Sequence, residues 1–170
     1  KLITEDFDLE YLHNAADKVR QKHYGKKVYL RGLIEISNYC KNDCFYCGIR
    51  CSNKLADRFR LSEEEILKRC EIGYELGFRT FVMQGGEDGF FTDDYLTDVV
   101  SQIKNRYPDC AVTLSLGERS RDSYKRLREA GADRYLLRHE TADSGHYARL
   151  HPENMSHEYR MECLYTLREL

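Results

Sequence analysis

The chain has 170 residues with a formal net charge of −2, and 41% of its residues are hydrophobic and 33% are charged. This is the composition of a globular protein, and its balanced charge gives no electrostatic reason to expect binding to nucleic acid or to a membrane surface. No apolar run approaches the roughly 20 residues that cross a bilayer. Four of the seven cysteines lie between residues 40 and 51. In a charged chain without a signal peptide, this clustering indicates a metal site in the cytoplasm rather than disulfides.

The first part of the chain predicts one helix, one strand and a long loop. Apolar residues recur at helical spacing over residues 8–23, and Gly25 follows as a stop. Residues 28–37 are rich in apolar and β-branched side chains, which is typical of a strand. A polar loop over residues 38–61 then carries the clustered cysteines. Loops of this length inside a compact domain are usually functional.

The rest of the chain alternates helices and strands. Ser62 and Glu65 form a capping box that begins a helix ending near Leu76, and Thr92 and Ser156 are expected to cap two later helices. Three further cysteines fall inside these elements, where free cysteines usually pack in the core: Cys70, Cys110 and Cys163. The other elements, in chain order, are a strand over 79–84, a helix over 93–107, a strand over 110–116, a helix over 120–130, a strand over 133–139, a loop to residue 157 and a final helix.

This alternation predicts parallel β/α units with right-handed crossovers. One helix followed by about four such units corresponds to the N-terminal half of a (β/α)₈ barrel of the TIM type, although a doubly wound sheet has the same local pattern. We expect an N-terminal helical extension over residues 1–27 and a partial barrel over residues 28–170. The final segment stops inside a helical pattern without a Gly or Pro terminator, so we expect a fragment or trimmed domain of a longer protein.

Cys40, Cys44 and Cys47 follow the first predicted strand with the spacing C-x3-C-x2-C. Thiolates are the natural ligands of iron–sulfur clusters, and three of them leave one iron of a four-iron cluster open to a substrate. Cys51 leaves a second interpretation, a closed four-thiolate site as in an iron–sulfur electron-transfer module or a zinc-binding module. The spacing disfavours both, because bacterial ferredoxins have a two-residue first gap and structural zinc sites use two well-separated ligand pairs.

Polar residues also follow the second predicted strand, in the run Gln84, Gly85, Gly86 and Glu87. Glycines let the backbone approach a ligand closely, and Glu87 and the nearby carbonyls can accept hydrogen bonds from an ammonium group. A simple turn is the alternative interpretation of this run.

The third and fourth predicted strands place further polar groups at the same end of a barrel. Alternation puts Thr113 and Ser115 on the face opposite the neighbouring leucines, which is the inward face. Arg138 and Glu140 share one face at the end of the fourth strand. An inward Arg138 suits a carboxylate, which it can pair bidentately, and an inward Glu140 suits an amine or a ribose hydroxyl. A structural Arg–Glu ion pair is the alternative.

Several runs of the sequence together resemble the HydE family of FeFe-hydrogenase maturases, which lies in the radical S-adenosylmethionine (SAM) superfamily. The cysteine triad marks only the superfamily, whereas the runs at 113–118 and 136–141 are more specific. Methylornithine synthase and biotin-synthase-like enzymes are the next most similar families and stay as alternatives. HydE proteins tend to have Ser where this chain has Gly85, so a ligand contact there must come from the backbone. The runs are residues 34–40 (IEISNYC), 44–48 (CFYCG), 84–88 (QGGED), 113–118 (TLSLGE) and 131–142 (GADRYLLRHETA).

The resemblance implies a radical SAM enzyme with a 4Fe-4S cluster on Cys40, Cys44 and Cys47. It implies reductive cleavage of SAM to a 5′-deoxyadenosyl radical, which attacks a cysteine-bound iron carbonyl–cyanide precursor during assembly of the hydrogenase two-iron centre. The implied partners are a small-molecule or organometallic substrate, other hydrogenase maturases and an electron donor. The expected SAM-binding residues are Tyr46, Gln84, Gly85, Gly86, Glu87, Glu140 and Arg160, and the expected substrate-binding residues are Thr113, Ser115 and Arg138.

Overall fold

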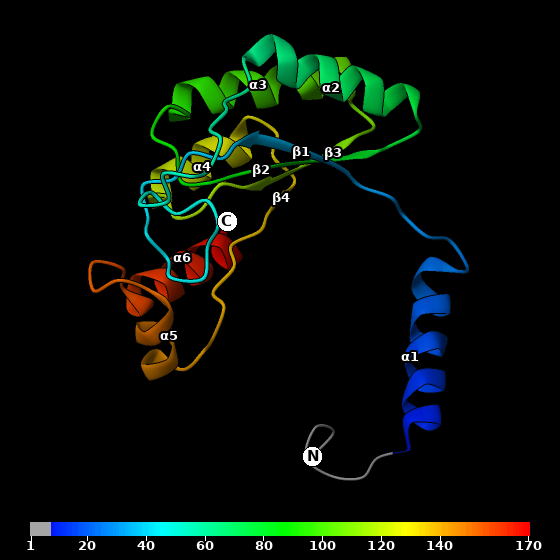
Figure 1. The fold of residues 1–170 in the computed structure, drawn as a ribbon. Coiled ribbons are helices and arrows are strands. Elements are labelled where there is room, and N and C mark those ends of the chain that lie inside the picture. Colours follow the sequence, from blue (N-terminus) through cyan, green and yellow to red (C-terminus); the bar gives the residue numbers. More distant parts are fainter. Residues whose placement is uncertain (1–7) are drawn as a thin grey trace. The chain divides into compact units, whose positions relative to one another are not determined.

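The computed structural model describes residues 8–170 and divides the chain into two compact units, residues 1–30 and residues 31–170. The described part of the first unit contains helix α1 (Leu9–Tyr24), seen in Figure 1. Asp8 caps α1 by accepting a hydrogen bond from the Tyr11 amide, and Gly25, with φ of 60°, ends it. The predicted helix is confirmed. The division into an extension over 1–27 and a barrel part over 28–170 stays a prediction.

The second unit is built on a four-stranded parallel sheet in the order β1-β2-β3-β4. A doubly wound sheet reverses its strand order at a switch point, whereas these strands follow one another in sequence order, as they do in a (β/α)₈ barrel. The fold is therefore part of a TIM-type barrel, as predicted. The strands are β1 (Gly32–Ser37), β2 (Thr80–Gly85), β3 (Ala111–Ser115) and β4 (Arg134–Tyr135).

Two strands are much shorter than predicted, and β3 is shorter by one residue at each end. The first begins at Gly32 rather than at residue 28, because its pairing with β2 starts at Gly32 opposite Phe81 and no strand of the described residues pairs with the residues before it. The last has two residues rather than seven, since only Arg134 and Tyr135 pair with β3 before the chain turns away. A strand with one neighbour can end as soon as that neighbour ends.

The predicted helix caps are confirmed. Ser62 and Glu65 make both bonds of the capping box, and Thr92 and Ser156 accept the expected amide hydrogen bonds. One helix was missed, because the segment before residue 157 was predicted as a loop. It has seven residues and contains Gly145, too short a stretch to show helical periodicity. The helices are α2 (Glu63–Glu75), α3 (Asp93–Arg106), α4 (Arg121–Glu129), α5 (Ser144–Leu150) and α6 (His157–Glu169).

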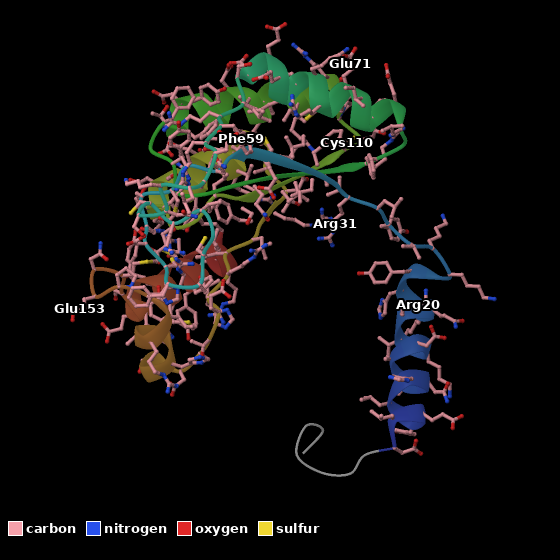
Figure 2. The ribbon with its side chains drawn as sticks, viewed as in Figure 1. Arg20, Arg31, Phe59, Glu71, Cys110 and Glu153 are labelled. Atoms are coloured by element: carbon pink, nitrogen blue, oxygen red, sulfur yellow. The ribbon has the colours of Figure 1, made fainter. Side chains whose placement is uncertain are left out.

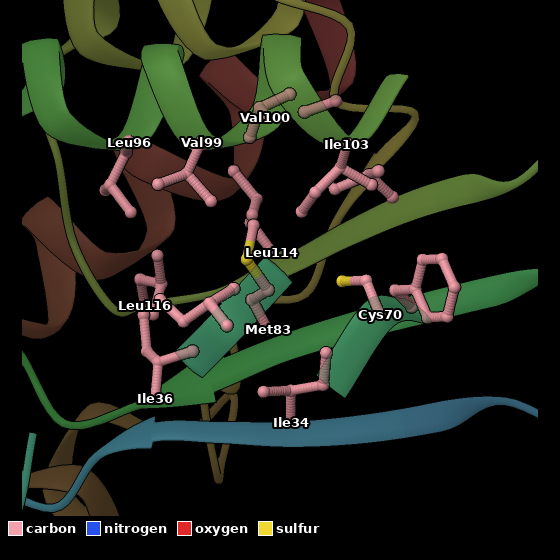
Figure 3. Packing of buried hydrophobic residues seen from close by; sticks show 14 of the residues in the cluster. Ile34, Ile36, Cys70, Met83, Leu96, Val99, Val100, Ile103, Leu114 and Leu116 are labelled. Atoms are coloured by element: carbon pink, nitrogen blue, oxygen red, sulfur yellow. The ribbon is translucent and has the colours of Figure 1, made fainter. Parts of the chain in front are cut away.

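The hydrophobic core lies between the sheet and the helices on one of its faces (Figure 1). In Figure 3, Leu96, Val99 and Ile103 of α3 point toward Met83 and Leu114 of the strands. The outer side of α2 is polar, and Figure 2 shows Glu71 pointing away from the sheet. Cys70, Cys110 and Cys163 are buried and free, as predicted.

A helix that crosses a membrane must be both long and apolar. No helix between residues 8 and 170 meets both requirements.

Candidate functional site

A cavity of about 200 Å³ lies at the carboxyl ends of the strands, between the cysteine loop, the loop after β2 and the segment after β4. Every site residue predicted from the sequence lines it except Thr113. The other lining residues are Glu35, Asn42, Ile49, Gly117, Leu136 and Leu137. The polar groups that the sequence places at the ends of separate strands therefore meet around one space, as the barrel geometry requires.

The three cysteines of the C-x3-C-x2-C run are free thiols on one side of this cavity. Burial, and then the neighbouring sulfurs of Cys40 and Cys47, raise the pKa of Cys44 to about 11. Burial also raises the pKa of Cys40. Cys51 is exposed and does not line the cavity, and its amide donates to the Asn42 carbonyl at 2.9 Å. The loop thus presents three clustered thiols and keeps the fourth cysteine apart.

The donor set also bears on which metal the site suits. Across residues 8–170, no three His, Cys, Asp or Glu side chains converge as they would on a single metal ion. A mononuclear zinc site needs such convergence. The thiolates of a cubane bind different iron atoms and need only surround the cluster. Cys40, Cys44 and Cys47 offer the thiolate donors that iron–sulfur clusters take.

Arg58 organises the cysteine loop from inside. Its guanidinium donates to the carbonyls of Ile49 at 2.9 Å, Arg50 at 2.8 Å and Asn53 at 3.1 Å, and also to that of Asn38. These carbonyls come from both arms of a loop that has no regular secondary structure. One side chain thus supplies much of the hydrogen bonding that a helix or sheet would otherwise provide.

A second cluster ties the ends of the cysteine loop to the loop after β2. The buried Asp88 carboxylate accepts hydrogen bonds from Arg60 Nε at 2.6 Å, Arg60 Nη2 at 2.9 Å and Ser37 Oγ at 2.7 Å. The same guanidinium lies over the Tyr39 ring, 3.9 Å from its centroid. Because Tyr39 directly precedes Cys40, this cluster fixes where the first thiol enters the cavity.

Gly86 is the point of closest approach between these two loops. A Cβ atom at this position would collide with the Tyr39 carbonyl and with the Cys40 side chain. Only glycine therefore allows the backbone after β2 to lie against the cysteine loop. The next residue continues the contact, since the Glu87 carbonyl accepts a hydrogen bond from the Lys41 amide at 3.0 Å.

The Glu87 side chain is buried at the edge of the cavity. Its Oε1 accepts a hydrogen bond from the Glu118 amide at 3.1 Å. Its Oε2 lies 3.1 Å from Lys41 Nζ, yet it accepts no well-aligned hydrogen bond within the described part of the chain. A buried carboxylate oxygen of this kind has capacity left for a donor from a ligand.

Arg160 is 7% exposed, so it is not an ordinary surface arginine. Its Nε donates to Glu118 Oε1 at 2.5 Å, and its Nη1 donates to the Arg138 carbonyl at 2.5 Å. Its Nη2 lies 3.7 Å from Glu87 Oε1. Burial lowers the pKa of this arginine, but the Glu118 carboxylate outweighs it and the net pKa is raised. Arg160 is thus a fixed cation that joins α6 to the loops after β3 and β4.

Ser115 and Thr113 lie at different depths. Leu114 and Leu116 pack in the core, as the alternation predicted, and Ser115 lines the cavity. Thr113 lies opposite Val82, one layer further from the carboxyl ends, and its buried hydroxyl makes no hydrogen bond within residues 8–170. The prediction that both hydroxyls line the same space is therefore met only by Ser115.

Arg138 and Glu140 both line the cavity, but not for the predicted reason. The strand ends at Tyr135, so strand alternation does not orient them, and Glu140 has a left-handed φ of 62°. Arg138 Nη2 donates to Gln84 Oε1 at 3.3 Å, and Gln84 Nε2 donates to Glu35 Oε1 at 2.8 Å. Arg138 therefore contacts an amide side chain rather than Glu140 in an ion pair.

The segment after β4 makes contacts with the cysteine loop that no sequence pattern indicated. The Phe45 amide donates to the Leu150 carbonyl at 3.0 Å, and Cys44 Sγ lies 3.6 Å from Met155 Sδ. The Tyr46 hydroxyl lies 3.3 Å from His151 Nε2. No local sequence pattern predicts these contacts, because they join residues more than 100 positions apart.

Comparison with known proteins agrees with this geometry. The chain is 46% identical over 161 residues to the [FeFe] hydrogenase maturase subunit HydE of Thermotoga maritima, covering 95% of the chain and 45% of that protein. It is 34% identical to the 3-methylornithine synthase of Methanosarcina acetivorans, covering 87% of the chain and 42% of that protein. The chain thus spans less than half the length of these relatives.

Solved structures give the same family. A crystal structure of methylornithine synthase matches with a TM-score of 0.84 and 30% identity, over 95% of this chain and 48% of that one. A crystal structure of HydG, a maturase of the [FeFe]-hydrogenase, matches with a TM-score of 0.84 and 28% identity, over 98% of this chain and 38% of that one. The family model of the Radical SAM superfamily matches residues 34–170, and the chain belongs to that superfamily.

Proposed function

We propose that the chain carries the cluster-binding part of a HydE-like radical SAM enzyme of hydrogenase maturation. The observation that carries the proposal is the meeting, around one cavity, of three clustered thiols with Glu87, Glu140 and Arg138. The 46% identity to a HydE protein supports this choice within the superfamily.

The residues present fit both cofactors of the superfamily, a 4Fe-4S cluster and SAM. Cys40, Cys44 and Cys47 are the proposed cluster ligands, which leave one iron free. The unsatisfied Oε2 of the buried Glu87, together with the carbonyls of Gly85 and Gly86, suits the ammonium group of SAM. When bound and reduced, the cluster supplies the electron that cleaves SAM to a 5′-deoxyadenosyl radical.

The chain's own residues bind and orient SAM in this proposal. Tyr46 is half exposed on the cavity and is proposed to lie beside the adenine ring, and Glu140 to accept from a ribose hydroxyl or an amine. Gln84 joins Glu35 and Arg138 in one hydrogen-bonded row. Arg160 already donates hydrogen bonds to Glu118 and to the Arg138 carbonyl. We therefore propose that it positions these groups and adds a positive charge to the SAM site.

The proposed substrate seat is formed by Arg138 and Ser115, with Thr113 beneath them. A carboxylate placed there can pair bidentately with the Arg138 guanidinium once this releases Gln84. A cysteine-derived, iron-bound organometallic compound has such a carboxylate. The proposed partners are other hydrogenase maturases and an electron donor, and the proposed compartment is the cytoplasm.

Two experiments on the full-length protein test the cofactors. After anaerobic reconstitution with iron and sulfide, Cys44→Ala should lose the cubane spectrum, and the matched Cys51→Ala should keep it. SAM should change the EPR spectrum of the reduced wild-type cluster, and Glu140→Ala should weaken this response. Loss of the cluster in the Cys51 variant would favour a closed four-thiolate electron-transfer site. An unchanged spectrum on adding SAM would contradict the enzyme proposal.

A further pair of assays tests the substrate. Arg138→Ala should cripple maturation of apo-hydrogenase while iron content and the SAM response stay intact, because the substrate carboxylate would lose its bidentate partner. Exposed Arg134, which makes no contact with the cavity, offers the control Arg134→Ala. Incubation of the wild type with lysine and SAM tests the methylornithine synthase alternative. Formation of methylornithine, or normal maturation by the Arg138 variant, would overturn the HydE assignment.

A further inference from the structure

The segment that contains α5 packs against the cysteine loop. The loop backbone bonds to it at the Leu150 carbonyl, and the thioether of Met155 lies against Cys44. His151 lies between Leu150 and Met155 in the sequence, and it is 3% exposed. A histidine buried this deeply beside a proposed cofactor seat has no part in the function described so far.

The contacts of His151 fix which ring nitrogen carries the proton. Its Nδ1 lies 2.9 Å from the Tyr147 carbonyl, and the His151 ring stacks on the Tyr147 ring with centroids 3.9 Å apart. A carbonyl can only accept, so Nδ1 must donate, and in the neutral imidazole Nε2 is then an acceptor. The Tyr46 hydroxyl, 3.3 Å from Nε2, is left to donate.

The two rings are also held at a defined angle. Tyr46 and His151 meet edge to face, with centroids 5.5 Å apart and ring planes at 88°. The Tyr46 side chain is 52% exposed and would otherwise be free to change rotamer over the open cavity. The hydrogen bond and the edge contact together hold the ring beside the Cys44 thiol.

We propose that His151 is a positioning residue, which holds the Tyr46 ring in the orientation that receives the adenine of SAM. This inference rests on the proposed function, since it concerns the same cofactor seat. His151 itself touches no reacting atom and acts through Tyr46.

A double-mutant cycle on the reconstituted full-length protein tests the inference. The measurement is the dissociation constant of SAM, from the SAM-dependent change in the EPR spectrum of the reduced cluster. Tyr46→Phe keeps the ring and removes the donor, and His151→Leu removes the acceptor. Each should weaken SAM binding about fivefold, the worth of one hydrogen bond of roughly 1 kcal/mol. The double variant should be no weaker than His151→Leu alone, because both changes remove the same bond.

The matched control is His157, whose ring also meets the Tyr147 ring, at 62° with centroids 5.1 Å apart, and which has no ring contact or hydrogen bond with Tyr46 within residues 8–170. His157→Gln should leave SAM affinity unchanged. His151→Gln retains an acceptor that can reach the Tyr46 hydroxyl, so it should recover most of the affinity lost in the Leu variant. Iron content and the spectrum without SAM should stay those of the wild type in Tyr46→Phe and His151→Gln.

The outcomes separate the inference from the function on which it rests. A wild-type cluster that does not respond to SAM would sink the proposed function. A wild type that responds, with Tyr46→Phe or His151→Leu binding SAM equally well, would overturn only the role of His151. Additive losses of SAM affinity in the double variant would show that His151 stabilises the segment that contains α5 and does not orient Tyr46. If His151→Leu fails to hold a cluster, Tyr46→Phe and the rescue by His151→Gln decide the matter.

Discussion

Replacing Arg58 with lysine should loosen the cysteine loop while leaving the sheet intact. The guanidinium bonds four carbonyls at once, whereas the single ammonium of lysine can reach one of them with good geometry. A net hydrogen bond is worth about 1 kcal/mol, and these carbonyls can regain water when the loop opens. Losing three of the four bonds should therefore lower the free energy of local opening by about 3 kcal/mol.

Native-state hydrogen exchange measures this opening directly. The Cys51 amide, bonded to the Asn42 carbonyl at 2.9 Å, and the Asn53 amide, bonded to the Arg50 carbonyl at 3.1 Å, report on the loop. A change of about 3 kcal/mol corresponds to a loss of protection of roughly 100-fold, provided that these amides exchange by local opening. Core amides of β2 and β3 should exchange at wild-type rates.

The matched control is Arg50→Lys. Arg50 lies in the same loop but makes one side-chain hydrogen bond, from Nη1 to the Cys47 carbonyl at 3.1 Å, which a lysine can replace. This variant should lose less than tenfold protection, since less than one bond's worth of about 1 kcal/mol is at stake. Equal protection of the loop amides in the wild type and in Arg58→Lys would refute the reasoning. The loop would then be held by its turns and by the Asp88 cluster alone.

The remaining predictions concern stability, measured by urea unfolding. Gly86→Ala should cost about 1–3 kcal/mol, because a methyl group there meets the Tyr39 carbonyl; Gly89→Ala, which meets nothing within 4 Å, is the control, and equal stabilities would show that the loops can separate. Burial raises the pKa of Asp88, but hydrogen bonds from Arg60 and Ser37 outweigh it and lower the net pKa. The stability it contributes is therefore present above its unfolded pKa and lost as the pH falls through the folded value. Asp88→Asn should flatten the loss of stability below about pH 4, and an unchanged acid limb would contradict this. Ser62→Ala should cost about 1 kcal/mol by removing the capping box, and a neutral result would show that water replaces the cap.

Much of the fold could be predicted because its signals are local. The capping box at Ser62 and the caps at Thr92 and Ser156 begin their helices at the residues expected. The missed helix α5 has seven residues, fewer than periodicity needs. The length of β4 depends on where β3 ends, which is a property of the neighbouring strand.

Some site residues could likewise be predicted from local signals, and others could not. Residues at strand ends, such as Gly86 and Ser115, could be placed around one cavity because parallel strands bring their carboxyl ends together. The depth of Thr113 below the cavity could not be predicted, because it depends on the register between β2 and β3. Arg58 and His151 were missed because their partners are scattered carbonyls or a hydroxyl 105 positions away, and such contacts leave no spacing to read.

The register of the sheet stacks its inner face in two rungs. Glu35, Gln84 and Ser115 form a polar rung near the carboxyl ends. Leu33, Val82 and Thr113 are paired one step below it. A molecule that enters from the carboxyl ends meets the polar rung first, and beneath it two hydrocarbon side chains and one hydroxyl. The space beneath the polar rung can therefore change through Val82, by enlargement to phenylalanine or trimming to alanine, without removing a polar contact above. The size of this space and the polar groups above it can thus change at different residues.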